Sequence, residues 1–202
     1  FYKHRPINLK KLSDIGFYPI TAKKMASAQK RFMTPKLVHG NVRPFNPETD
    51  IDGVVQLMNE TNVNFKYDVD FTPDVVRHFF TPVNDVLYSY VIPNSNRIDA
   101  VFSFYLMNWS ILQDNGQVSE VRAAYIWYCA TTSIDLNSLV ADLINKAAND
   151  AKVDIVNSLC TMGLNDALTA NKFEIGDKEL QFYSYNYAVP DIALNEFRFL
   201  FI

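Results

Sequence analysis

The sequence predicts a mixed α/β domain in which helices cover the faces of a β-sheet. Two observations support this class. Helical and strand-like apolar patterns alternate along the chain. In addition, 49% of the 202 residues are hydrophobic, which is enough for a substantial core. This length fits one sizeable domain or two small ones.

Four helices are predicted before the first long strand, each beginning at a residue type that commonly starts a helix. Apolar residues recur at helical spacing in the first three of them. The expected starts are Asn8, Thr21, Pro47 after Asn46, and Pro73 after Thr72, and the fourth helix reaches about Phe80.

Strands are predicted where β-branched and aromatic residues cluster. An amphipathic helix, Leu136 to Ala151, separates the third of these strands from the fourth and gives the alternation of a mixed sheet. The expected strands are Val86 to Ile92, Ala100 to Met107, Val121 to Thr131, Val153 to Leu159 and Leu180 to Tyr187.

The end of the chain is apolar and aromatic. Phe197, Phe199 and Phe201 alternate as they would in a strand with one buried face, and Ile202 is the last residue. Burying such a strand would carry the terminal carboxylate inward, where its raised pKa would make it a better proton acceptor near neutral pH. The alternative is a closing strand whose terminus still reaches water.

Composition excludes several classes of protein. A net charge of −3 argues against a nucleic-acid-binding surface. The two cysteines and three histidines lack metal-ligand spacing, so neither a metal site nor a disulfide framework is predicted. With no signal peptide and no apolar run of membrane-spanning length, a cytoplasmic protein without a transmembrane segment is expected. The chain begins at Phe1 rather than Met, which suggests a piece of a longer protein.

The glycines and potential nucleophiles are also informative. No two of the six glycines lie close together, whereas a backbone cradle for pyrophosphate needs clustered glycines. The chain is therefore not expected to hold a nucleotide or a coenzyme A diphosphate by itself. No Ser or Cys stands between flanking glycines, so no nucleophile elbow is predicted.

Several motifs resemble one family in a single order along the chain. They are Tyr2 to Leu12 with Gly16-Phe17, Ser103-Phe104-Tyr105, Ala123-Ala124-Tyr125, Lys172 to Lys178 and Leu180 to Tyr187. Together they resemble the carboxy-terminal half of glycylpeptide N-myristoyltransferases. The segment Lys172 to Lys178 is similar to the family signature lysine-phenylalanine-glycine-x-glycine-aspartate-glycine.

The resemblance implies one lobe of a pseudo-twofold, two-lobed enzyme, each lobe similar to a GCN5-related acetyltransferase. Residues 1–202 would be the peptide-binding lobe, and an absent amino-terminal lobe would hold most of the myristoyl-CoA co-substrate and the oxyanion hole. The whole enzyme would move myristate onto the N-terminal glycine of proteins, with no tightly bound cofactor. Its association with ribosomes or a membrane surface is a further expectation.

The resemblance also implies site residues. The carboxylate of Ile202 would be the catalytic base, and His4, Phe17, Tyr125, Gly176 and Asp177 would bind the peptide. Each peptide-binding residue has a plainer interpretation: His4 as a surface residue, Phe17 and Tyr125 as core, and Asp177 as a turn former beside Gly176.

Two further aromatic residues and three departures from the family pattern complete the expectations. Tyr105 is expected to pack, and Trp109 to shape selectivity. Glu174, Lys178 and Arg198 stand where the family has glycine. These changes leave open a second interpretation, a non-catalytic peptide-binding or regulatory domain of the same fold. A third, a free-standing acetyltransferase-like domain, is disfavoured by the missing glycine-rich loop.

Overall fold

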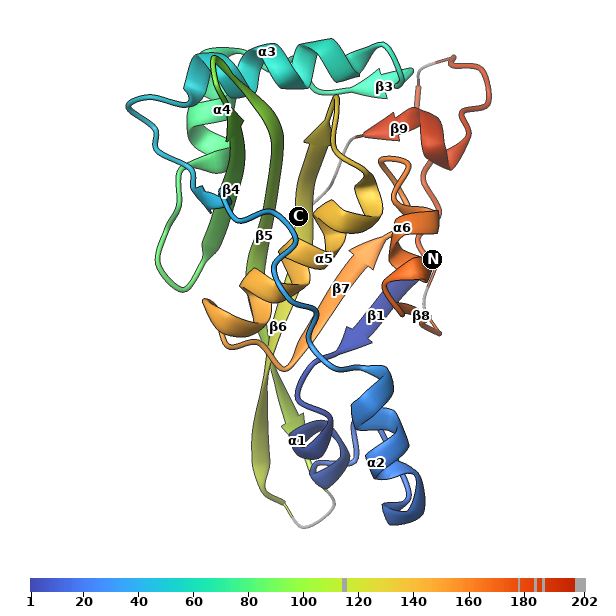
Figure 1. Cartoon of the computed structure of the whole chain (residues 1–202). Coiled ribbons are helices and arrows are strands. Elements are labelled where there is room, and N and C mark those ends of the chain that lie inside the picture. Colours follow the sequence, from blue (N-terminus) through green and yellow to red (C-terminus); the bar gives the residue numbers. More distant parts are fainter. Residues whose placement is uncertain (114–115, 178, 184, 187, 199–202) are drawn as a thin grey trace.

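A computed structural model of the chain describes residues 1–113, 116–177, 179–183, 185–186 and 188–198 (Figure 1). In these residues, seven strands form one sheet in the order β2-β4-β5-β6-β7-β1-β8. The β6–β7 pair is parallel and the other neighbours are antiparallel. The strands are β1 (Tyr2–Pro6), β2 (Arg43–Pro44), β4 (Leu87–Asn94), β5 (Arg97–Leu112), β6 (Val118–Thr131), β7 (Ile155–Leu159) and β8 (Glu174–Ile175).

Helices pack on both faces and at the ends of this sheet. In Figure 1, α5 lies in front of β5 and β6, and α4 lies behind β4. A short parallel pair, β3 (Tyr67–Asp68) with β9 (Phe197–Arg198), sits apart from the main sheet. The helices are α1 (Leu9–Asp14), α2 (Ala22–Arg31), α3 (Ile51–Asn62), α4 (Pro73–Phe80), α5 (Leu136–Asn149), α6 (Asn165–Ala170) and the 3₁₀ turn η1 (Leu194–Glu196). The predicted mixed α/β class is confirmed.

Local capping explains where two helices begin. The Asn8 side chain accepts a hydrogen bond from the Lys11 amide at 3.3 Å, and Thr72 accepts one from the Val75 amide at 3.3 Å. Thr21 directly precedes α2, although its side chain makes no capping bond. These three predicted starts are confirmed.

The predicted start of the third helix is wrong. The chain turns at residues 46–50, and α3 begins at Ile51. Asn46 caps the turn by accepting from the Glu48 amide at 3.0 Å, while the Asp50 carboxylate accepts from the Asn46 amide at 2.7 Å and from Arg43. An ion pair to β2, which helix periodicity does not reveal, therefore delays the helix.

The predicted strand Leu180 to Tyr187 is also wrong. None of its described residues is in a strand, and Tyr183 and Tyr185 are 86% and 94% exposed. A strand needs a neighbour for its backbone groups, and β8, the edge strand, pairs with β1 over only two residue pairs. In contrast, Tyr2–Pro6 forms β1, which apolar alternation did not predict.

The sheet divides near its middle. Strands β6 and β7 pair only from Ala123↔Ile155 to Tyr125↔Asn157, and β7 then continues beside β1. Nearby, the β5–β6 register shifts between Phe102 and Phe104, which marks a bulge. The two halves of the sheet therefore diverge beyond Tyr125, which places this residue at the base of the division.

Candidate functional site

Strand pairing places four polar or aromatic side chains in a row across the sheet. His4 of β1 lies opposite Asn157 of β7, Asn157 opposite Tyr125 of β6, and Tyr125 opposite Tyr105 of β5. Cross-strand partners share a face of a sheet, so this row crosses four strands on one side. It joins residues that are up to 153 positions apart in the sequence.

Ring contacts extend the row into a continuous surface. Tyr105 stacks on Tyr125 with centroids 5.3 Å apart, and Tyr2 meets Tyr125 edge-on at 6.3 Å. Trp109 contacts Tyr125 at 6.2 Å and Phe17 at 5.3 Å. We call the set Tyr2, His4, Phe17, Tyr105, Trp109 and Tyr125 the aromatic face. Phe17 is exposed and the others are half-buried, so the face is open to a ligand.

The phenols of this face remain neutral. Burial raises the pKa of Tyr2 and of Tyr125, and it raises the pKa of Tyr105 to about 12. All three hydroxyls therefore keep their protons at physiological pH and can donate hydrogen bonds. An aromatic surface with neutral donors suits an extended peptide, which presents carbonyl oxygens and apolar side chains.

The loop after α1 places Phe17 at the edge of the aromatic face. Gly16 takes a positive φ of 73°, which ends the helix, and the Tyr18 amide then bonds to the Leu12 carbonyl at 2.9 Å. Leu12 is buried with Val121, Ala123 and Ile155 in a small cluster beneath the loop. Apolar packing under β6 and β7 therefore fixes the position of Phe17.

Gly176 packs directly against His4. The Gly176 amide bonds to the Tyr2 carbonyl at 2.9 Å, and a Cβ on Gly176 would overlap the His4 ring, 2.6 Å from its Cδ2. On its other side, His4 Nδ1 bonds to the buried Asn157 Oδ1 at 2.6 Å. The His4 ring is therefore held between β7 and the loop that follows β8. Asp177 comes next and is exposed at the rim.

Glu174, at a glycine position of the resembled signature, joins two parts of the molecule. It lies opposite His4 in the β1–β8 pair. Its carboxylate accepts a hydrogen bond from the Tyr18 hydroxyl and lies 3.0 Å from Arg31 Nη2. Burial, followed by the hydrogen bond and charge of Glu174, raises the pKa of Tyr18 to about 12. Glu174 thus ties β8 to α2 beside the aromatic face.

Sequence reasoning missed Tyr2 and Asn157. Tyr2 belongs to the Tyr2 to Leu12 motif without being marked there as a site residue, and nothing in the sequence marks Asn157 as a neighbour of His4. Asn157 is fully buried, and its Nδ2 has no hydrogen-bond partner within the described part of the chain. A buried amide group normally has such a partner, so this unpaired donor next to His4 is an exception. Ile202 and Lys178, which the sequence analysis singled out, lie outside the described residues.

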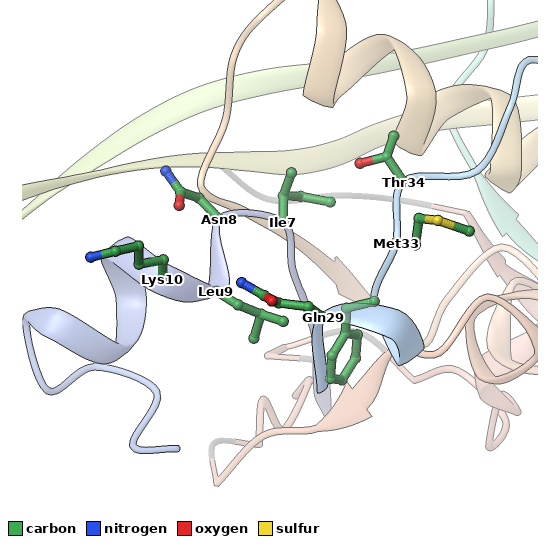
Figure 2. Close-up of a pocket in the computed structure, with 8 residues that line it drawn as sticks. Ile7, Asn8, Leu9, Lys10, Gln29, Met33 and Thr34 are labelled. Atoms are coloured by element: carbon green, nitrogen blue, oxygen red, sulfur yellow. The ribbon is translucent and has the colours of Figure 1, made fainter. Parts of the chain in front are cut away.

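Two hollows lie away from the aromatic face. The smaller, about 190 Å³, lies beside the start of α1 and the end of α2 (Figure 2). Its residues are Ile7, Asn8, Leu9, Lys10, Gln29, Phe32, Met33 and Thr34. The larger, about 620 Å³, is lined in part by Lys3, whose side chain projects from β1 opposite to that of His4. Neither hollow contains a predicted site residue.

Metal and membrane features can be stated for the described residues. Within them, no group of His, Cys, Asp or Glu side chains could hold a metal ion. None of the helices in the described part of the chain has the length and apolar character needed to cross a bilayer.

The sheet with its flanking helices is the fold of an acetyltransferase. The structure is similar, with a TM-score of 0.54, to a protein from Clostridium acetobutylicum described as a predicted acetyltransferase with acetyl-CoA. The match covers 71% of this chain and 95% of that chain at 15% identity, so it shows the fold alone. It confirms the predicted acetyltransferase-like architecture.

Sequence comparison assigns the chain to one family with this fold. A family model described as myristoyl-CoA:protein N-myristoyltransferase, C-terminal domain, matches residues 14–197, and the chain belongs to this family. It is 31% identical over 187 residues to the glycylpeptide N-tetradecanoyltransferase of Plasmodium falciparum, and 32% identical over 209 residues to that of Aspergillus fumigatus.

Structure and coverage agree with this assignment. The chain matches Saccharomyces cerevisiae N-myristoyltransferase with bound myristoyl-CoA at a TM-score of 0.76 and 25% identity, over 87% of this chain and 47% of that one. The two relatives above are matched over 92% and 95% of this chain but over only 45% and 42% of their own lengths. The chain therefore spans less than half of the curated relatives it matches.

Proposed function

We propose that this chain is the peptide-binding lobe of a two-lobed N-myristoyltransferase. The whole protein would transfer myristate from myristoyl-CoA to the N-terminal glycine of other proteins. The observation that carries the proposal is the aromatic face, because rings from β1, β5 and β6 form one open surface in a chain of this family.

In this proposal the aromatic face binds the first residues of the substrate. Aromatic rings provide a large apolar contact at small cost in side-chain entropy, and the neutral tyrosine hydroxyls donate to peptide carbonyls. Asn157 holds the His4 ring in place at this surface through the 2.6 Å hydrogen bond between its Oδ1 and His4 Nδ1. The part of the protein outside this chain would hold most of the myristoyl-CoA, since the glycines here are too widely spaced to cradle its diphosphate.

The chemistry needs a base. A peptide amino group has a pKa of about 7.7–8.0 and is mostly protonated at neutral pH, so it cannot attack a thioester. We propose that the Ile202 carboxylate accepts this proton. The freed nitrogen then forms a bond to the thioester carbonyl carbon and the C–S bond breaks. The nitrogen gives its second proton to the sulfur, so coenzyme A leaves as its thiol and the product amide keeps one proton. A side chain on the first residue would crowd the attacking nitrogen, which explains a requirement for glycine.

Calorimetry on the whole protein tests the binding step. A peptide with a free N-terminal glycine is compared with its N-acetylated twin, and only the free form should bind tightly. Tyr125→Ala should weaken its binding about tenfold, because a central aromatic contact is lost. The control Val63→Ala alters a residue directly after α3 that is 87% exposed and lies outside the aromatic face, and it should have no effect. Equal binding of both peptides would contradict recognition of the ammonium group.

An added residue tests the base. Extending the chain past Ile202 by one residue displaces the carboxylate by about 3.3 Å in an extended chain. We expect acyl transfer to be abolished while the peptide still binds. Full activity of the extended protein would contradict the assignment of Ile202. Binding without transfer by the unaltered protein would instead favour a non-catalytic peptide-binding domain.

A further inference from the structure

Arg198, the last described residue before the chain end, is fully buried in β9. It lies opposite Asp68 in the parallel pair of β9 with β3. Its Nε bonds to Asp68 Oδ1 at 2.8 Å, and its Nη2 bonds to Asp68 Oδ2. The Asp68 side chain is 6% exposed. The ion pair is therefore bidentate and shielded from water, so it fixes the relative orientation of the two side chains as well as the distance between them.

The remaining contacts of the guanidinium group come from α3 and its neighbours. Nη1 donates to Thr61 Oγ1 at 2.7 Å, and Nη2 donates to the Met58 carbonyl at 2.9 Å. The rings of Phe65 and Phe71 lie 4.7 Å and 5.2 Å from the guanidinium carbon. Arg198 therefore joins β9 to the end of α3 through charge, hydrogen bonds and ring contacts together.

The residues next to Arg198 are held as well. The Lys66 amide donates to the Glu196 carbonyl at 2.8 Å, and the Lys66 ammonium lies 2.7 Å from the Glu196 carboxylate. The Phe197 carbonyl accepts from the Met162 amide at 3.0 Å. The backbone at residues 196–197 is therefore held on both sides, against β3 and against the turn after β7.

We propose that Arg198, paired with Asp68, is a positioning residue for acyl transfer, and this inference rests on the proposed function. Covalent geometry keeps the terminal carboxylate within about 14 Å of Arg198, so the anchor limits where the base can be. A misplacement of about 1 Å between reacting groups can cost about 100-fold in rate. A glycine at this position could make none of these side-chain contacts, so the anchor depends on the Arg198 side chain.

Steady-state acyl transfer by the whole protein tests the proposal. Arg198→Lys keeps the positive charge but loses the bidentate hydrogen bonding to Asp68. We expect kcat to fall about 10- to 100-fold, with the peptide KM within about twofold of the unaltered protein. A residue that only stabilises the fold would lower activity in proportion to the folded fraction, so assays are run well below each variant's unfolding temperature.

A matched control and a milder variant keep the test decisive. The control is Arg43→Lys, which alters another bidentate ion pair, with Asp50 at 2.6 and 2.8 Å. Because Arg43 and Asp50 lie outside the β3–β9 strand pair, this variant should leave kcat unchanged. Should Arg198→Lys fail to fold, Thr61→Val removes one hydrogen bond to Arg198 and should lower kcat by severalfold at unchanged KM.

The outcomes separate the two proposals. Unchanged kcat in the folded Arg198 and Thr61 variants, or an equal loss in Arg43→Lys, would overturn the positioning role while leaving the proposed function intact. Absence of acyl transfer by the unaltered protein to the peptide with a free N-terminal glycine would overturn the proposed function and the positioning role together. A kcat-specific loss restricted to Arg198 and Thr61 variants would support both.

Discussion

At Gly176 the absence of a side chain is a packing requirement. The loop after β8 lies so close to His4 that any Cβ would overlap the ring, and on its far side the ring is hydrogen-bonded to Asn157. The His4 ring therefore cannot move away without losing that bond. The glycine of the signature motif has a physical explanation here, namely close approach to a site residue.

Gly176→Ala should accordingly weaken peptide binding. Displacing His4 costs the hydrogen bond to Asn157, worth about 1 kcal/mol, and a tilted ring narrows the aromatic face. We expect the peptide dissociation constant to rise about 5- to 10-fold, measured by calorimetry. Gly40→Ala is the control, because a Cβ there meets nothing within 4 Å. Unchanged affinity in Gly176→Ala would contradict a role for His4 in the site.

The family resemblance named residues of the candidate site but not their geometry. Tyr125, His4 and Gly176 were named from motifs, and strand pairing then brings them together. Asn157 was missed because its position beside His4 depends on the order of β6, β7 and β1, which no local pattern encodes. The partner of Arg198 was equally hidden, since Asp68 is 130 residues away.

Among the elements, α5 is covered on its outer side by the segment 33–42, which crosses in front of it (Figure 1). One buried carboxylate on α5 secures this crossing. Asp142 accepts from the Val38 amide at 2.5 Å, from the His39 amide at 3.3 Å and from His39 Nδ1 at 2.6 Å. The segment needs this anchor because it contains no regular structure over residues 33–42.

Asp142→Ala should therefore be strongly destabilising. It leaves two backbone amides and one ring nitrogen without their acceptor, at a cost of about 3 kcal/mol. Urea unfolding should show a lower midpoint with an unchanged slope. Asp135→Ala, which removes the N-cap of the same helix, should cost only about 1 kcal/mol. Equal losses in the two variants would contradict the anchoring role.

Local sequence predicted some helix starts correctly and failed for another helix start and for one strand. The starts at Asn8 and Thr72 were correct because a capping side chain acts within its own turn. The start of α3 was wrong because Asp50 is engaged by Arg43 of β2. The expected strand at Leu180 to Tyr187 was wrong because strand formation depends on a neighbour, which periodicity alone cannot supply.

The Asp50 carboxylate also makes stability depend on pH. Burial by itself would raise its pKa, but hydrogen bonds from Arg43, the Asn46 amide and Thr49 outweigh burial, and the net pKa is lowered. A lowered pKa in the folded state contributes stability that is present above the unfolded pKa of about 3.9. This contribution is lost as the pH falls through the folded pKa, which lies below that value.

Asp50→Asn should remove this part of the acid sensitivity. The free energy of unfolding, measured by urea titration from pH 7 down to pH 2, should start lower in the variant. It should then fall less steeply than in the unaltered protein below about pH 4. Parallel curves for the two proteins would contradict the lowered pKa of Asp50.

At the scale of the whole molecule, apolar side chains are exposed along the segment that follows β8. Leu180, Tyr183, Tyr185 and Leu194 are each about half exposed or more. Several large apolar or aromatic side chains exposed along one segment are typical of an interface. Since the chain spans less than half of the curated relatives it matches, we propose that the rest of the protein packs here.

Chemical labelling of tyrosines compares the isolated chain with the whole protein. Tyr183 and Tyr185 should react readily in the isolated chain, where they are 86% and 94% exposed, and should be protected when the rest of the protein is present. Tyr128, which is fully buried in the core, is the control and should resist labelling in both. Equal labelling of Tyr183 and Tyr185 in both proteins would place the interface elsewhere on the lobe.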